Sequence, residues 1–353
     1  MAVEAAPAPR DRLQSAWRLH GLLWVFLFVS SGISIIVGAA GAQVRDAVFA
    51  WVTTGVLDPT AAIILFDIRL PRLAMGLLVG AALAVSGAVM QGLFRNPLAD
   101  PGLVGVSAGA GLGAISAIVL GALLPLWAQS AVGNQLVPIS AFLGGWISTL
   151  VLYRVSTQSG RTSVATMLLA GIALGALAGA VSGILVYMAD DRQLRDLTFW
   201  GLGSLAGATW GKVLTAGPLI ALGVLTAPLL ARGLNALAMG EAAAGHMGVP
   251  LEKLKTGAIL IVAASVGAAV AVSGAIGFVG IVVPHLLRLA TGPDHRTLLP
   301  NAAVLGAALL VLADALSRTV VAPAELPIGI ITAVIGAPVF LWILLHRRHL
   351  VDL

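Results

Sequence analysis

The sequence predicts an all-α protein that spans a membrane ten times and keeps both termini on the cytoplasmic side. Of its 353 residues, 59% are hydrophobic and 10% are charged, whereas soluble domains carry about 25% charged residues. The 42 glycines favour helices that pack closely through small residues. Stretches without any charged residue recur along the chain, as expected of helices that cross a hydrocarbon core roughly 30 Å thick. These observations exclude a soluble multidomain enzyme.

The charge-free stretches predict where the spans lie. They cover residues 19–44, 73–94, 101–153, 162–189, 213–231, 256–287, 297–313 and 326–346. The third stretch is long enough for two helices, with a break between Pro125 and Pro138. The first apolar run has no obvious small-residue cleavage site after it, so we expect it to be retained as a span.

The distribution of positive charge decides how often the stretch 256–287 crosses the membrane. As one straight helix it would measure about 48 Å, which exceeds the hydrocarbon core. It also contains Gly274 and Gly277, where a helix can break. Two crossings put 13 of the 20 Lys and Arg residues inside, and one crossing puts 10 of them inside. Because cytoplasmic segments are enriched in Lys and Arg, two crossings are favoured, which gives ten spans.

The predicted organisation is a cytoplasmic segment at 1–20 followed by one membrane domain at 21–346, with a cytoplasmic loop at 232–255 inside it. The outside segments are 43–72, 124–136, 189–212 and 318–327. Part of the first, 47–66, is apolar enough to lie on the membrane or dip into it without crossing. The basic residues lie between apolar runs, so the net charge of +5 does not indicate nucleic-acid binding.

Three sets of glycines recur at four-residue spacing, which predicts that each set lies on one helix face. The sets are Gly105, Gly109 and Gly113; Gly171, Gly175, Gly179 and Gly183; and Gly203, Gly207 and Gly211. Close helix packing accounts for such faces. For the second set, a face that stays unfilled to leave room for a large solute is the alternative interpretation, and the sequence leaves both open.

Motifs of catalytic chemistry are missing from the sequence. The single Gly-Lys pair, Gly211-Lys212, is followed by Val213 and not by the Ser or Thr of a phosphate-binding loop. The chain has no cysteine, which excludes thiolate metal sites and cysteine nucleophiles. The histidines His20, His246, His285, His295, His346 and His349 fall in or beside segments predicted to lie inside. A proton relay or a metal site at the membrane midplane is therefore not expected.

Asp314 and Arg318 are four residues apart and therefore lie on one helix face, near the outer end of the ninth span. Charged residues in a span are costly in lipid and are functional candidates. An ion pair that locks the helix and a role for Arg318 at the outer surface are both open, and the two roles can coexist.

Three stretches carry a family resemblance. The first combines Arg69-Leu-Pro-Arg72 and Gly87-Ala-Val-Met-Gln91 with Arg95-Asn-Pro-Leu-Ala-Asp-Pro-Gly-Leu-Val-Gly-Val-Ser107. The second is Gly274-Ala-Ile-Gly-Phe-Val-Gly-Ile-Val-Val-Pro-His285, and the third is Ala324-Glu-Leu-Pro-Ile-Gly-Ile-Ile-Thr-Ala-Val-Ile-Gly-Ala-Pro338. Together they closely resemble the permease subunits of bacterial ABC importers for vitamin B12, iron-siderophores and haem, and the likeness covers residues 20–346.

The resemblance implies a subunit with ten spans in the bacterial inner membrane, in agreement with the count from charge. It implies a homodimer in the lipid bilayer with a solute path at the two-fold axis. Two ATPase subunits on the cytoplasmic side would bind ATP and Mg²⁺, and a periplasmic binding protein would dock outside. The chain itself is expected to be no enzyme and to bind no cofactor, metal or nucleic acid.

The resemblance also implies roles for residues at both ends of the spans. Arg69, Arg72 and Arg318 match arginines that dock acidic residues of the binding protein, with ordinary interfacial anchoring as the alternative. The segment 237–250 resembles the helices that couple to the ATPase, with a plain connecting loop as the alternative. Its candidate coupling residues are Gly240, Glu241, Gly245, His246 and Gly248, and we expect Glu241 to have no competing partner within the chain.

In the family the fifth span, here 164–188, lines the path, and the loop 156–163 lies near the inner gate. This favours an open face for the second glycine set. It makes Met167 and Met188 candidate weak contacts for a solute, although apolar packing is the alternative.

The outer segment Leu194–Trp210 looks most like the haem permeases, so haem is the expected solute, with a ferric siderophore or cobalamin as the alternative. Arg192 and Arg195 lie at the predicted outer mouth, where arginines can bind the propionates of haem. Ion pairs of these arginines with Asp190, Asp191 or Asp196 are the alternative. An ion-coupled transporter working alone would need midplane acids or histidines, for which only Asp314 is a candidate.

Overall fold

A computed structural model describes residues 9–38, 41–55 and 58–346. The first half of the chain forms α1 (Pro9–Ile36), α2 (Gly41–Thr54), α3 (Pro59–Ile63), α4 (Leu70–Phe94), α5 (Val106–Leu120), α6 (Leu126–Val132), α7 (Leu136–Ser156) and α8 (Val164–Met188). The second half forms α9 (Asp191–Leu202), α10 (Trp210–Thr226), α11 (Ala231–Leu237), α12 (Glu241–His246), α13 (Leu251–Ser273), α14 (Val279–Thr291), α15 (His295–Ser317) and α16 (Ile328–His346). Between α7 and α8, the strands β1 (Thr157–Gln158) and β2 (Arg161–Thr162) pair as an antiparallel hairpin.

The predicted all-α membrane fold is confirmed, and its described helices fit the predicted count of ten spans. Eight helices of the described residues are long and apolar enough to cross a membrane, and two shorter apolar helices, Val279–Thr291 and Ile328–Trp342, complete the set. The stretch 256–287 breaks as predicted, since α13 ends at Ser273 and α14 begins at Val279. Gly274 makes this break possible: its φ is +70°, and a Cβ there would lie 2.2 Å from the carbonyl oxygen of Trp200.

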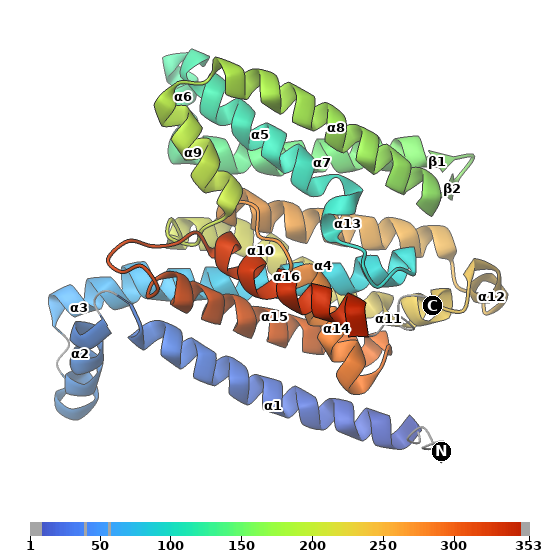
Figure 1. The fold of residues 1–353 in the computed structure, drawn as a ribbon, viewed down its shortest axis with the longest axis horizontal. Coiled ribbons are helices and arrows are strands. Elements are labelled where there is room, and N and C mark those ends of the chain that lie inside the picture. The colour runs from blue at the N-terminus through green and yellow to red at the C-terminus, as the bar shows by residue number, and fades with distance from the viewer. Residues whose placement is uncertain (1–8, 39–40, 56–57, 347–353) are drawn as a thin grey trace.

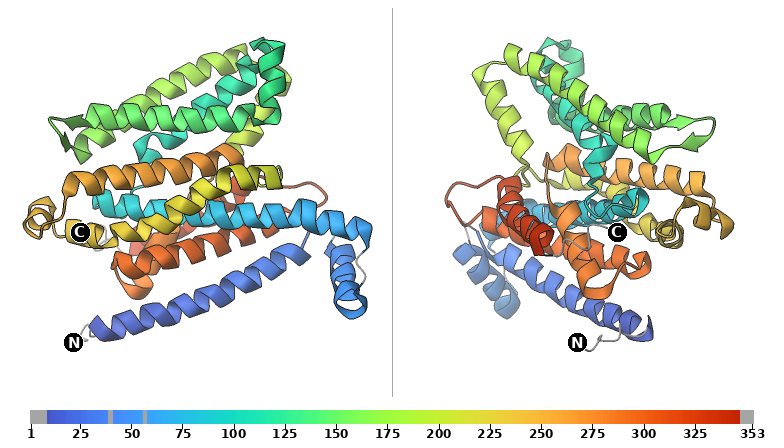
Figure 2. Two further views of the ribbon diagram at one scale, coloured as in Figure 1. Left: turned by 180° about the vertical axis from the view of Figure 1, so that it is seen from behind. Right: turned by 45° about the vertical axis from the view of Figure 1, so that its right-hand side comes forward.

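The helices form two packed groups with α13 between them (Figure 1). One group contains α5, α7 and α8, and the other contains α4, α14, α15 and α16, with α1 along its edge (Figures 1 and 2). Segments predicted to lie outside, including α6, α9 and the loop 318–327, gather at one end of the bundle. The hairpin, α12 and the first residues of α1 lie at the opposite end, as predicted for inside segments.

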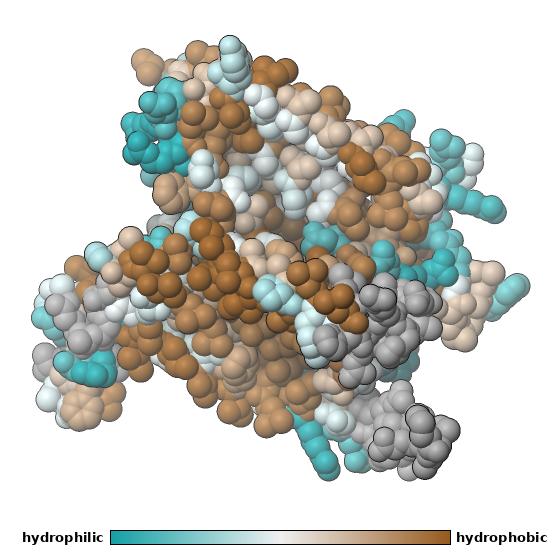
Figure 3. Space-filling model, in the orientation of Figure 1, coloured by the Kyte–Doolittle hydropathy of each residue, from teal (hydrophilic) through white to brown (hydrophobic). Residues whose placement is uncertain are grey.

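The core lies around α4, α13 and α15, while α8 lies at the periphery. The most apolar 18 residues of each long helix are buried to different extents. Of these residues, 72% are buried in the helical run Pro59–Phe94, 67% in α13 and 72% in α15, but only 11% in α8. Apolar side chains spread across the middle of the visible face, and polar residues gather toward its ends (Figure 3). This is the pattern expected of a chain whose middle meets lipid or another subunit.

Gly109 and Gly113 of the first glycine set pack closely, as ordinary helix packing requires, whereas Gly105 has a φ of +75° and precedes α5, so its predicted place on the same helix face is wrong. A Cβ on Gly109 would lie 2.3 Å from the carbonyl oxygen of Gly144, and one on Gly113 would lie 2.0 Å from that of Ser140. These contacts bring the backbones of α5 and α7 together. The prediction that Gly203 shares a helix face with the two glycines that follow it at four-residue spacing is wrong. Gly203 has a φ of +69° and ends α9, so no helix continues through it.

The outside segment 43–72 is also more helical than predicted. A continuous helical run extends from Pro59 to Phe94, with a π-helical stretch at Ile64–Arg69, so that Arg69 and Arg72 lie on the spanning helix itself. The α2 helix stands apart from the bundle (Figure 2). It exposes Phe49 and Val52, which are 71% and 77% exposed, as expected of a segment that lies on a membrane.

Candidate functional site

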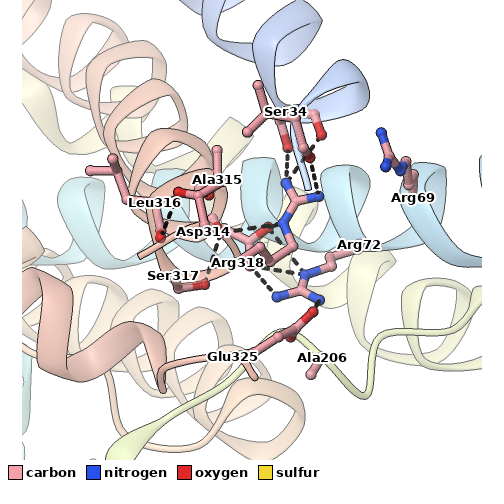
Figure 4. Close-up of polar contacts among 12 residues, drawn as sticks. Ser34, Arg69, Arg72, Ala206, Asp314, Ala315, Leu316, Ser317, Arg318 and Glu325 are labelled. Carbon is pink, nitrogen blue, oxygen red and sulfur yellow. Dashed lines mark hydrogen bonds and ion pairs between the residues drawn. The ribbon is translucent and has the colours of Figure 1, made fainter. Parts of the chain in front are cut away.

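Five charged side chains at the outer end of the bundle form what we call the outer charge cluster. They are Arg69, Arg72, Asp314, Arg318 and Glu325 (Figure 4). Arg72 lies between the two acids: its Nε and Nη2 each lie 2.9 Å from Asp314 Oδ1, and its Nη1 lies 2.9 Å from Glu325 Oε2. Paired bonds of this kind between guanidinium and carboxylate groups are strong and directional.

The other two arginines of the cluster bind the end of α1. Arg318 Nη2 donates to the carbonyl oxygen and to Oγ of Ser34, at 3.1 and 2.9 Å, and its Nη1 donates to the carbonyl oxygen of Val37 at 3.1 Å. Arg69 donates to the carbonyl oxygen of Ile35. The last carbonyls of a helix have no partner within the helix and carry partial negative charge, which guanidinium groups satisfy. The cluster therefore ties α1 to α4 and α15.

The predicted pair of Asp314 and Arg318 is present, with Arg318 Nε 3.2 Å from Asp314 Oδ2. Arg69, Arg72 and Arg318, the arginines predicted to dock the binding protein, are buried at the outer end of the bundle and do not lie open on its surface. Their exposed fractions are 6%, 8% and 7%, because partners within the chain surround them. A docking role for these arginines stays a prediction.

Glu325 is the member of the cluster that sequence reasoning missed. Its side chain is 39% exposed, against 9% for Arg72 and 3% for Asp314, so it is the part of the cluster that solvent and a partner can reach. It lies in the stretch 324–338 that carries the family resemblance, but its partner Arg72 is 253 residues away in sequence. Nothing in the local pattern points to that pairing.

The glycines of α8 divide into one packed residue and three open ones. A Cβ on Gly171 would lie 2.5 Å from the carbonyl oxygen of Leu103, whereas nothing in the described chain lies within 4 Å of a Cβ on Gly175, Gly179 or Gly183. The glycine face therefore stays unfilled by the described chain from Gly175 to Gly183.

The two methionines of α8 differ in the same way. Met188 is 62% exposed at the outer end of the helix. Met167 is 1% exposed and belongs to the apolar core, so it does not offer its sulfur to a solute, and its prediction as a pathway residue is wrong.

Both arginines at the predicted outer mouth are exposed on α9. Within the described part of the chain, neither Arg192 nor Arg195 takes part in an ion pair. Asp190, one of their expected partners, instead caps α9: its Oδ1 accepts the backbone N–H of Gln193 at 2.8 Å. The two cations are thus left available for an anionic ligand.

The segment 237–250 contains the short helix α12 at the inner end of the bundle (Figure 1). Gly240 and Gly248 flank it with φ values of +103° and +79°, which reverse the chain on either side. Gly245 and His246 are exposed on it.

The expectation that Glu241 has no partner within the chain is wrong, since Glu241 Oε2 lies 3.0 Å from Lys255 Nζ. Lys255 is 3% exposed and lies on α13, the helix between the two groups. Lys255 is the last residue of the predicted cytoplasmic loop 232–255, and the sequence gives no sign of this contact.

A cavity of ≈ 220 Å³ lies beside the break between α13 and α14 and is lined partly by Asp100, Ser107 and Gly277. Asp100 Oδ1 accepts the backbone N–H of Gly102 at 2.7 Å and so caps the short 3-10 helix Pro101–Val104. Burial raises the pKa of the Asp100 carboxyl above its ordinary value of 3.8, and the bond from Gly102 offsets part of this rise.

Comparison with known proteins gives consistent matches. The model of the FecCD transport family matches residues 23–346. The hemin transport system permease protein HmuU of Yersinia pestis is 48% identical over 287 residues, which cover 80% of this chain and 83% of that protein. The vitamin B12 import system permease protein BtuC of Escherichia coli is 44% identical over 300 residues, which cover 85% of this chain and 89% of that protein.

One solved structure extends this similarity to the fold. An inward-facing conformation of a metal-chelate type ABC transporter superposes with a TM-score of 0.79 at 32% identity, covering 92% of this chain and 97% of that one.

Proposed function

The chain belongs to the FecCD transport family and is the permease subunit of an ABC importer in the bacterial inner membrane, and from this premise we propose that its cargo is haem. It is a transport component and not an enzyme. Its family implies ATPase partners and a periplasmic binding protein. The proposal concerns what passes through it and which residues meet that solute.

The observation that carries the proposal is the pair of free arginines on α9. Haem is an apolar disc with two propionates, and carboxylates form strong charge-assisted bonds with guanidinium groups. Arg192 and Arg195 are one helical turn apart on α9 and exposed, with no ion pair in the described part of the chain. Relatives named for hemin and for vitamin B12 are 48% and 44% identical, too close together to decide the solute. The arginines therefore carry the choice of haem.

We also propose that two copies of the chain enclose the path. The open face of α8, with Gly175, Gly179 and Gly183, leaves space that nothing in the described chain fills. Small residues on such a face allow a second helix or a broad flat solute to approach. In this proposal the face lines the path at the two-fold axis.

Because the three arginines at the outer end are buried, a binding protein that docks there cannot contact their side chains directly. The outer charge cluster holds three arginines and two acids, which leaves an excess of one positive charge at this end. A net charge steers an oppositely charged partner without direct contact. We propose that the cluster attracts an acidic binding protein and that Glu325, its exposed member, lies at the edge of the contact.

At the inner end we propose that α12, with Gly240, Glu241, Gly245, His246 and Gly248, contacts the ATPase, where ATP and Mg²⁺ would bind.

The deciding experiment is uptake by proteoliposomes that contain this chain and its ATPase, with the binding protein outside. Haem, cobalamin and a ferric siderophore are supplied in turn, with and without ATP trapped inside. ATP-dependent entry of haem alone is the expected result. Entry of cobalamin or the siderophore instead would overturn haem and keep the importer, and the relatives named for vitamin B12 make cobalamin the second candidate.

A further inference from the structure

A buried lysine at the inner end of the bundle has an acceptor for each of its three protons. Lys255 Nζ lies 2.8 Å from the carbonyl oxygen of Thr162, 3.0 Å from Glu241 Oε2 and 3.5 Å from Glu252 Oε1. A lysine ammonium has three donors, so these acceptors use its full capacity. Its side chain is 3% exposed, while those of Glu241 and Glu252 are 44% and 38% exposed. The charge is therefore buried, and its counter-charges reach the surface.

The same contacts hold Thr162 at both of its backbone polar groups. Its N–H donates to Glu252 Oε2 at 2.9 Å, and its carbonyl oxygen accepts from Lys255. Thr162 is the last residue of β2, and α8 begins at Val164 directly after the capping residue Ser163. The start of α8 is thus fixed to α13 by two side chains and not by packing alone.

Glu241 connects this anchor to α12. It is the first residue of α12, and its carboxylate reaches Lys255, which lies on the helix that follows in sequence. Met239 and Met247 beside α12 are 71% and 53% exposed, so the segment offers its apolar surface to a partner. One ammonium group consequently joins a surface helix to Thr162, two residues before α8 begins.

We propose that Lys255 is a positioning residue that transmits movement of α12 to the inner end of α8. The inference rests on the proposed function, in which the ATPase contacts α12 and α8 lines the path. Separating Lys255 from its partners is costly because its ammonium, 3% exposed, would be left buried without a counter-charge. The two acids and Thr162 therefore follow Lys255 as one unit when α12 moves.

The test compares four variants in the assembled transporter with ATPase and binding protein. Lys255→Met removes the link, and Lys255→Arg keeps the charge. Glu252→Gln weakens the link at an acid whose side chain is 38% exposed, which carries less risk for folding. Lys253→Met is the matched control, because Lys253 is exposed on the same helix. Uptake and ATP hydrolysis are measured in the same proteoliposomes.

We expect Lys255→Met and Glu252→Gln to keep ATP hydrolysis and to lower the solute moved per ATP by about tenfold, within the usual range of coupling between sites. Lys255→Arg should restore part of this ratio, and Lys253→Met should leave it unchanged. An unchanged ratio in Glu252→Gln and Lys255→Met overturns the inference. So does a loss of ATP hydrolysis and uptake in equal proportion in Glu252→Gln, since this is what a purely structural role predicts.

A second measurement needs no solute and so separates this inference from the proposed function. The chain has no cysteine, so spin labels can be placed at Gln158→Cys on the hairpin and Ala242→Cys on α12 without background from the chain itself. We expect the distance between the labels to stay constant with and without ATP, and to change with ATP once Lys255→Met is added. A distance that responds to ATP in the presence of Lys255 overturns the link. Absent haem uptake with a constant distance would instead count against haem alone.

Discussion

Replacing Arg72 by methionine should lower the free energy of unfolding by about 3 to 5 kcal/mol, the usual cost of removing one partner from a buried ion pair. The structure gives the reason. Asp314 has a side chain that is 3% exposed and would lose its bonds to Arg72 at 2.9 Å, while Glu325 would lose another at 2.9 Å. Asp314 keeps its contact with Arg318 at 3.2 Å, so we expect the lower end of the range. The contribution of Glu325 is small, because salt bridges of partly exposed groups contribute about 1 kcal/mol or less.

The measurement is unfolding of the purified chain in detergent by titration with a denaturing detergent, followed by circular dichroism. The matched control is Arg45→Met. Arg45 pairs with Asp46 at 3.1 Å, but both side chains are more than half exposed, at 65% and 68%. Its loss should therefore cost less than about 1 kcal/mol.

Equal stability of the Arg72→Met and Arg45→Met variants would refute the reasoning. It would mean that Arg72 is held for a partner outside the chain and not for the fold. A docking assay on the same variants then distinguishes the two roles. If stability falls as expected, a charge reversal at Arg72 cannot serve as a pure docking test, because the new acid would face Asp314 and Glu325.

Three further predictions concern the path and the cavity. Arg192→Gln with Arg195→Gln should lower haem uptake at least about tenfold, since each lost charge-assisted bond is worth about 1.5–3 kcal/mol. Arg45→Gln, which changes an exposed arginine on α2, is the control in the same transport assay, and an equal loss in both would contradict a role in propionate binding. Gly179→Leu should block uptake without lowering the stability of the chain, because nothing in the described chain lies within 4 Å of a Cβ at this position. Gly109→Leu should destabilise the chain, because its Cβ would lie 2.3 Å from a backbone oxygen. Denaturant titrations and uptake assays of both variants test this pair. Burial raises the pKa of Asp100, so the charged form of this side chain disfavours folding. The free energy of unfolding should therefore fall as the pH rises from below 3.8 through the raised pKa. Measured over a series of pH values, the free energy of unfolding should depend less on pH in the Asp100→Asn variant.

The spans were predictable from sequence because each depends on a local property, the length of an apolar run. The break at Gly274 was equally local, since glycines in a run too long for one helix indicate where it ends. The pair of Asp314 and Arg318 was predictable because four-residue spacing places both on one helix face. These features need no knowledge of which helices become neighbours.

The partners of the other buried charges could not be predicted in this way. Arg72 meets Asp314 across 242 residues, and Lys255 meets Thr162 across 93. Such contacts depend on how the helices pack, and no periodic pattern records them. The sequence therefore predicts arginines such as Arg72 at the outer surface, although an ion pair with a buried acid of the same chain stabilises the charge equally well. Arg192 and Arg195 on α9 are exposed, as the sequence predicts. Their neighbouring acid Asp190 accepts a backbone N–H at the start of α9 and forms no ion pair with them.

The two charged networks restrict how the chain can move. The outer charge cluster joins α1, α4 and α15, which belong to one packed group. The contacts of Lys255 join α12 and the hairpin before α8 to α13, the helix between the groups. Movement within the first group would break buried ion pairs and is costly. Movement of α5, α7 and α8 relative to α4, α14 and α15 leaves the outer charge cluster intact. Lys255 lies at the inner end of the boundary between these two groups. A link between α12 and the path is therefore most effective at this position, because a displacement there shifts one group against the other without breaking the interior of either.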